Sequence, residues 1–353
     1  MIRDLIESRH FSLWVGAVFF VLMALVPTLL GVAGVAGGGI AQLDMLNKIG
    51  IYAALALSLN IILGQTGLFH MGHTAFFAMG AYTTAILNTL YGWPILATLP
   101  IAGLFAAVFA FLLALPIIHL RGDYLLVVTI GIVEIVRISL MNNIFGLTGG
   151  ANGIYGISRP SLFGLVFSSQ KLQFYLIWGF TAITVSLFYL LEHSRFGRAL
   201  NYIKHDELAA SGCGINVTRY KLIAFALGAF WAGMAGTLFA ANIRTIEPSS
   251  FNFYESVILF AIVILGGSGS NAGVILGAFL LIGLQDVFRG FESARMLIFG
   301  AAMMLMMIFR PQGLLPPRRR RYDARDLVGV FPGALDAPDT PSPPEQGRSG
   351  EPS

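Results

Sequence analysis

Residues 192 to 221, EHSRFGRALNYIKHDELAASGCGINVTRYK, form a hydrophilic and mostly basic loop between two apolar runs, residues 172–191 and 222–241. Runs of this length can each cross a membrane, because a spanning helix needs about 20 apolar residues. Further apolar runs begin near residues 11, 43, 72, 94 and 124. The sequence therefore predicts an all-α polytopic membrane protein, in which the 192–221 loop is a surface for docking another protein.

The composition excludes a soluble globular protein. Of the 353 residues, 56% are hydrophobic and only 11% are charged, whereas soluble domains carry about 25% charged residues. The net charge of +4 comes mainly from clusters beside the apolar runs, which indicates the cytoplasmic face of a membrane protein rather than binding of nucleic acid. The single cysteine, Cys213, excludes a disulfide within the chain and a cysteine-based metal cluster.

The apolar runs divide the chain into three parts. Residues 1–10 are predicted to be a cytoplasmic N-terminus, residues 11–309 a transmembrane domain, and residues 310–353 a basic and then disordered cytoplasmic tail. The run 11–30 is interpreted as an uncleaved first span. A cleaved signal peptide is the alternative, although the apolar region of a signal peptide usually has about 7–15 residues.

The distribution of Lys and Arg predicts how often the chain crosses the membrane. These residues gather in the N-terminus, in the 192–221 loop and just after residue 309, whereas loops 145–170 and 242–253 carry one Arg each. Since basic loops stay in the cytoplasm, an even number of spans must separate the basic segments. The stretch 254–288 is interrupted by Gly and Ser. A helical hairpin there gives about ten spans, and a single broken helix gives about nine.

Two glycine-interrupted segments share the pattern L-G-x-x-G, residues 63–67 and 265–269. Paired breaks in the two halves of a membrane protein indicate internal duplication and a substrate site near the bilayer midplane; chance similarity of two Gly-rich turns is the alternative. The candidate substrate-pathway residues at these breaks are Gly64, Gln65, Thr66, Gly67, His70, His73, Gly266, Gly267 and Gly269. No metal site is predicted at the two histidines, because a metal needs a third ligand.

Glu134 and Arg137, three residues apart inside a predicted span, complete the candidate pathway residues. They share a helix face and can pair with each other. Pairing is needed, because a charge in the membrane core costs about 2.5–3.5 kcal/mol. The pair either lines the transport pathway or clamps helices together as a structural ion pair.

Within the 192–221 loop, Asp206-Glu207-Leu208-Ala209-Ala210 is predicted to form a short helix that ends at Gly212 or Gly214. One apolar face of the loop is expected to include Leu200, Ile203 and Leu208, and Ala210 is a further candidate. This spacing alone is typical of an ordinary surface helix between two spans.

Part of this helix, Glu207-Leu208-Ala209-Ala210 followed by Gly214-Ile215-Asn216, resembles the coupling-loop signature of bacterial ABC importer permeases. Other segments match in the same order: GHTAFF at 72–77, LRGDY at 120–124, LTGGANGI at 147–154 and FRPQGL at 309–314. Over about residues 43–315 the chain resembles the LivM-type permease subunits of bacterial branched-chain amino-acid ABC importers. It departs from the family in reading Glu-Leu-Ala-Ala rather than Glu-Ala-Ala, so the register of docking stays open.

The resemblance implies a multi-pass permease in the bacterial inner membrane that works with a second permease subunit, two ATPase subunits and a periplasmic substrate-binding protein. It also implies that the 192–221 loop is the coupling loop, with a helix over roughly Lys204 to Gly212 docked on the ATPase. The implied coupling residues are Lys204, Asp206, Glu207, Ala209, Ala210, Gly212 and Gly214. A Glu207→Arg variant is therefore expected to fold but to lose ATPase binding.

The chain has no G-x-x-x-x-G-K-[ST] motif, so ATP must bind a partner subunit and no cofactor is expected on this chain. The expected function is transport of branched-chain or similar hydrophobic amino acids, with no covalent chemistry. One alternative is an ion-coupled secondary transporter that uses Glu134, and another is an ABC permease for urea or short amides. An intramembrane enzyme is disfavoured, because His70 and His73 lack the further residues that acid–base or metal chemistry needs.

Overall fold

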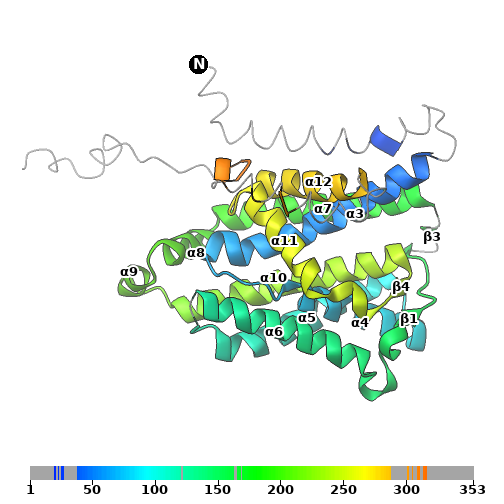
Figure 1. The fold of residues 1–353 in the computed structure, drawn as a ribbon, viewed down its shortest axis with the longest axis horizontal. Coiled ribbons are helices and arrows are strands. Elements are labelled where there is room, and N and C mark those ends of the chain that lie inside the picture. The colour runs from blue at the N-terminus through cyan, green and yellow to red at the C-terminus, as the bar shows by residue number, and fades with distance from the viewer. Residues whose placement is uncertain are drawn as a thin grey trace, which may run out of the picture. The chain divides into compact units, whose positions relative to one another are not determined.

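The computed structural model describes residues 38–120, 122–162, 165–167 and 169–287, together with residues 20, 23, 25–27, 300, 301, 304, 308–310 and 313–315. These residues belong to one compact unit, residues 1–317. Most of the predicted first span and of the predicted tail lies outside the described residues. Within them the protein is an all-α helical bundle with two short antiparallel strand pairs (Figure 1).

The helices follow the predicted apolar runs closely. α3 (Gly38–Asn60) continues into the π-helical turn η1 (Ile61–Gln65), and an irregular connection then leads to α4 (His73–Tyr91). The remaining helices are α5 (Ile95–Ile117), α6 (Asp123–Met141), α7 (Gln170–His193), α8 (Arg195–His205), α9 (Glu207–Gly212), α10 (Val217–Ile243), α11 (Phe253–Gly266) and α12 (Asn271–Val287). Short 3₁₀ turns lie in the connections, at η2 (Ile144–Gly146), η3 (Gly150–Asn152) and η4 (Pro248–Phe251).

Five of the described helical segments are long and apolar enough to cross a membrane: Ala41–Gln65, Ile95–Ile117, Asp123–Met141, Gln170–His193 and Val217–Ile243. α11 and α12 are shorter apolar helices. These helices make the protein a multi-pass membrane protein by length and composition. The total number of spans also depends on residues 1–37 and 288–309, most of which lie outside the described part of the chain.

α10 is the central helix of the bundle and packs against α3, α4 and α5. Small residues along α10 allow this packing, because larger side chains would hold the backbones apart. A Cβ added at Gly236 would lie 2.7 Å from the Ala81 nitrogen of α4, and one added at Gly233 would lie 2.7 Å from the Ala102 oxygen of α5. The close contacts fix α10 firmly against the helices that surround it.

Residues 253–287 form a helical hairpin. α11 and α12 pack antiparallel, since Gly277 of α12 lies against Ile262 of α11 while Gly273 lies against Gly266. The second L-G-x-x-G segment, residues 265–269, is therefore the tip of this hairpin.

The bundle has two ends of different character, with α8 and α9 at one and the pair β1–β4 at the other (Figure 1). β1 (Ile154–Tyr155) pairs antiparallel with β4 (Thr245–Ile246), and β2 (Ser161–Leu162) pairs with β3 (Leu165–Val166). α10 begins just after α9 and finishes just before β4. The basic 192–221 loop thus lies at one end, the α9 end. The loops that are poor in Lys and Arg lie at the other, the β1–β4 end.

Candidate functional site at the α9 end

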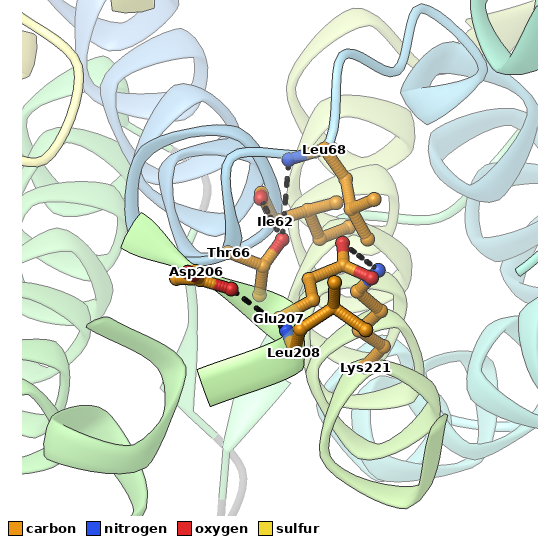
Figure 2. Close-up of polar contacts among 7 residues, drawn as sticks. All are labelled: Ile62, Thr66, Leu68, Asp206, Glu207, Leu208 and Lys221. Atoms are coloured by element: carbon orange, nitrogen blue, oxygen red, sulfur yellow. Dashed lines mark hydrogen bonds and ion pairs between the residues drawn. The ribbon is translucent and has the colours of Figure 1, made fainter. Parts of the chain in front are cut away.

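The 192–221 loop folds into two helices, α8 and α9, separated at Asp206. Asp206 has an extended backbone (φ −155°, ψ 110°), and its side chain accepts hydrogen bonds from Leu208 N at 2.8 Å and Ala209 N at 3.0 Å. Figure 2 shows the bond to Leu208. An Asp that caps the first turn in this way starts a new helix. The short helix predicted from Asp206 to the glycines is confirmed as α9, with Asp206 as its cap. The wider range from Lys204, which the resemblance implies, starts too early, because Lys204 lies in the last turn of α8, which ends at His205.

An ion pair fixes α9 to α10. The Glu207 carboxylate accepts a hydrogen bond from the Lys221 ammonium (Figure 2). Lys221 is only 3% exposed, and a buried cation that loses its partner is strongly destabilising. Glu207 is thus engaged within the chain. A Glu207→Arg variant would bring a second cation against Lys221, so the expectation that this variant folds normally is not supported by the geometry.

The break at Asp206 decides which side chains of α9 face outward. Leu200, Ile203 and Ala210 are buried, whereas Leu208 is 79% exposed. The prediction that Leu208 shares their apolar face is wrong, because the capping turn changes the direction in which the second helix presents its side chains. Of the candidate coupling residues, Asp206, Ala209, Gly212 and Gly214 are exposed, Lys204 and Glu207 are partly buried, and Ala210 is buried. Leu208 is the outward-facing apolar residue that the sequence analysis left out of this set.

Lys204 points from α8 into the bundle. Its ammonium donates a hydrogen bond to the Gly64 carbonyl at the end of η1, at 2.7 Å. Burial lowers the pKa of Lys204, because removal from water disfavours the charged form. The first glycine break therefore lies against the 192–221 loop at the α9 end, rather than halfway along the bundle as the paired-break interpretation predicts.

The two L-G-x-x-G segments, far apart in sequence, meet at this place. Asn60 Oδ1 accepts a hydrogen bond from Gly269 N at 2.8 Å, and Asn60 Nδ2 donates to Asn271 Oδ1 at 3.3 Å. A Cβ added at Gly64 would lie 2.5 Å from Gly269 N and closer still to Asn60 Oδ1. Only a glycine lets the two breaks approach this closely.

The second break is also contacted by residues that follow the predicted transmembrane domain, residues 11–309. Leu314 N donates to the Leu265 carbonyl at 2.8 Å, and Leu315 N donates to the Gly266 carbonyl at 3.1 Å. These two bonds satisfy carbonyls at the C-terminal end of α11. Residues 313–315 therefore lie at the α9 end together with both breaks.

The histidines lie deeper in the bundle, where the irregular segment 66–72 runs into α4. Both are buried: His73 Nε2 forms a hydrogen bond with Ser58 Oγ at 2.7 Å, and His70 Nδ1 accepts one from Gly72 N at 3.2 Å. The ring of His70 packs against Phe76 and Phe225, with centroids 5.7 and 5.0 Å away. In the described part of the chain no group of three or more His, Cys, Asp or Glu residues is placed to hold a metal ion.

Three buried polar atoms near this segment have no hydrogen-bond partner among the described residues: Gln65 Oε1, His70 Nε2 and His73 Nδ1. A buried polar atom without a partner costs about 1–3 kcal/mol. Water or a polar group of a transported molecule would remove this cost. Thr66 is satisfied within the chain, because its hydroxyl donates to the Ile62 carbonyl (Figure 2).

Glu134 and Arg137 form the ion pair that their spacing predicts. Arg137 Nη2 and Nε lie 2.7 and 2.9 Å from Glu134 Oε2. Both side chains are about one third exposed (34% and 28%) on α6, and among the described contacts they bond to each other and to Met141 of the same helix. The structure does not bring this pair to the glycine breaks.

Comparison with known proteins identifies the family. The family model described as "Branched-chain amino acid transport system / permease component" matches residues 41–309. The chain is 44% identical over 292 residues to the high-affinity branched-chain amino acid transport system permease protein LivM of Escherichia coli (strain K12). That match covers 76% of this chain and 68% of the relative.

More distant relatives extend the comparison. A probable branched-chain amino acid transport permease protein LivM of Methanocaldococcus jannaschii is 27% identical over 87% of this chain and 92% of its own length. The ribose import permease protein RbsC of Escherichia coli (strain K12) is 27% identical over 37% of this chain and 43% of its own length. No solved structure matches the chain. Because the family model and the 44% identical relative both cover most of the chain, it belongs to the family of permease components of branched-chain amino acid transport systems.

Proposed function

We propose that this chain is the membrane-spanning permease subunit of an ATP-driven importer for branched-chain or similar hydrophobic amino acids. The proposal rests on α9, a short capped helix at one end of a permease-family fold. An ion pair between the partly exposed Glu207 and the buried Lys221 holds α9 on a long span, and Leu208 of α9 is exposed. A single exposed leucine is common on protein surfaces, so its place is what matters: α9 is joined to a long span by an ion pair, in a chain of a permease family. A passive pore or an ion-driven carrier has no need for such a helix.

The partners follow from this mechanism. A second permease subunit would complete the pathway, two ATPase subunits would bind and hydrolyse ATP, and a periplasmic binding protein would deliver the amino acid. This chain has no P-loop sequence, so nucleotide chemistry belongs to the partners. Closure of the ATPases would move α9 together with α10, because Glu207 and Lys221 join them.

The proposed topology has about ten spans, with both termini and the 192–221 loop in the cytoplasm. α10, α11 and α12 are three successive crossings, and residues 313–315 lie back at the α9 end. We propose that a last span before residue 310 returns the chain to this end. The basic character of the 192–221 loop supports the cytoplasm as the location of that end.

The proposed substrate pathway passes the irregular segment 66–72. There, buried polar atoms of Gln65, His70 and His73 lie in a region that also contains the rings of Phe76 and Phe225. Polar atoms beside apolar rings suit a molecule with a charged backbone and an aliphatic side chain. The glycines of the two breaks are proposed to shape the end of this pathway that lies next to the 192–221 loop.

Uptake into vesicles that contain the whole importer tests the function. Leucine uptake is expected to require ATP, to continue when an uncoupler removes the proton gradient at constant ATP, and to be competed by isoleucine and valine but not by urea. Uptake that stops with the uncoupler would favour an ion-coupled carrier instead. Competition by urea and not by isoleucine would favour the amide importer.

A further inference from the structure

A chain of hydrogen bonds joins the 192–221 loop to both glycine breaks. Lys204 in the loop bonds the Gly64 carbonyl of the first break at 2.7 Å. Glu192, at the start of the loop, accepts a hydrogen bond from Asn271 Nδ2 just after the second break at 3.2 Å. Asn60 bonds both Gly269 N and Asn271. We call Asn60, Gly64, Gly269 and Asn271 the break junction.

The contact at Gly64 depends on the π-helical turn. In a regular α-helix the Gly64 carbonyl would accept from the amide of residue 68. Here Leu68 N instead bonds the Thr66 hydroxyl, at 3.4 Å. The last carbonyls of a helix have no partner within it, and a cationic side chain can supply one. Lys204 fills this position from another helix, so the end of η1 depends on the position of α8.

Lys204 is also held along its stem. A Cβ added at Gly67 would lie 3.2 Å from Lys204 Cγ, so the aliphatic part of the side chain packs on the turn that follows η1. The lysine therefore contacts the first break at both ends of the turn, Gly64 and Gly67. A displacement of α8 would move the ammonium, the stem and the backbone of the break together.

We propose that Lys204 is a positioning residue that transmits movement of the 192–221 loop to the break junction, which acts as a hinge at the α9 end of the transport pathway. This inference rests on the proposed coupling function and assigns Lys204 a role inside the permease instead of at the ATPase surface. Since Asn60 joins the two breaks, one movement of α8 displaces the ends of both α3 and the α11–α12 hairpin. Asn271 provides a second link between the 192–221 loop and the break junction, because it bonds Glu192.

The test measures amino acid transported per ATP hydrolysed by the complete importer in proteoliposomes. Lys204→Met keeps the length of the stem and removes the donor. It is expected to keep ATPase co-purification while the transport ratio falls on the order of tenfold, as loss of a charge-assisted hydrogen bond predicts. Lys204→Arg retains a donor and is expected to recover most of the ratio. Arg198→Met is the matched control, because Arg198 of α8 is exposed and bonds the nearby His193 carbonyl.

The results distinguish a role of Lys204 in transmitting movement from a role in binding the ATPase and from a general loss of protein stability. A wild-type ratio in Lys204→Met, or an equal loss in Arg198→Met, would overturn the proposal. Loss of ATPase co-purification in Lys204→Met would also overturn it, since that result makes Lys204 a docking residue. Asn271→Ala tests the second link independently. It is expected to lower the amount of amino acid transported per ATP hydrolysed, and an unchanged ratio would contradict the hinge. Absence of ATP-driven uptake by the wild-type importer would instead overturn the proposed function.

Discussion

Leu208 is the side chain on which the proposed docking role of α9 depends. It lies in the first turn of α9 and is 79% exposed, while Ala210 of the same helix is buried. A leucine left in water forgoes about 1.5–3 kcal/mol of burial. Because Asp206 and the ion pair of Glu207 hold α9 in place, this cost is not relieved within the described chain. An ATPase groove that covers Leu208 would recover it.

Replacing Leu208 with Ser is expected to reduce ATPase co-purification at least about tenfold, because a buried interface leucine contributes on the order of 1.5–3 kcal/mol. Stability should change by less than about 0.5 kcal/mol, as for other surface substitutions. The measurement is the ATPase retained by the tagged permease, with thermal unfolding in detergent as the stability check. Phe145→Ser is the matched control, since Phe145 is 92% exposed at the β1–β4 end. Equal losses in both variants would argue against docking at Leu208.

At the scale of elements, α9 is a short helix that is held in place by its N-terminal cap and by its ion pair with α10. Six residues are too few for a helix to be stable alone. The Asp206 cap begins it, and the pair between Glu207 and the buried Lys221 ties it to α10. The same pair makes α9 a stiff extension of a span, which is what transmission of force requires.

Glu207→Ala is expected to destabilise the protein by about 3 kcal/mol, the lower end of the range for breaking a buried pair, because Glu207 is partly exposed. Adding Lys221→Met should recover most of that loss, since no unpaired charge then remains. Thermal or denaturant unfolding of the two single variants and the double variant measures the coupling between the residues. Strictly additive effects would show that the pair does not hold α9.

Sequence patterns predicted the spans well and the contacts between them poorly. The helix α7 agrees with its apolar run, residues 172–191, to within a few residues at both ends, and α5 begins near its predicted start at residue 94, because length and hydropathy alone define such helices. The break at Asp206 had a recognisable signal, an Asp before a short helix. By contrast, the pairing of β1 with β4 and the contact of the first break with the second join residues far apart in sequence. No local pattern carries that information.

At the scale of the whole described bundle, the elements that coupling needs lie together. The 192–221 loop, both glycine breaks and residues 313–315 are linked by hydrogen bonds at the α9 end. The strand pair β1–β4 lies at the opposite end (Figure 1). A permease driven from the cytoplasm needs this separation, because the ATPases must act on one face while the substrate is delivered to the other.

The proposed coupling therefore requires the α9 end to lie on the cytoplasmic side of the membrane. Cys213, the only cysteine of the chain, follows α9 directly and is exposed. A matched reporter for the other end is Ser249→Cys in a Cys213→Ser background, because Ser249 is exposed in η4. Both proteins are to be expressed without the ATPase, so that docking cannot shield Cys213.

The measurement is labelling with a membrane-impermeant maleimide on intact spheroplasts and again after permeabilisation. We expect Cys213 to react only after permeabilisation, whereas the cysteine at position 249 is expected to react on intact spheroplasts. Labelling of Cys213 on intact spheroplasts would place the 192–221 loop outside the cell and would contradict its role as the docking surface for an ATPase.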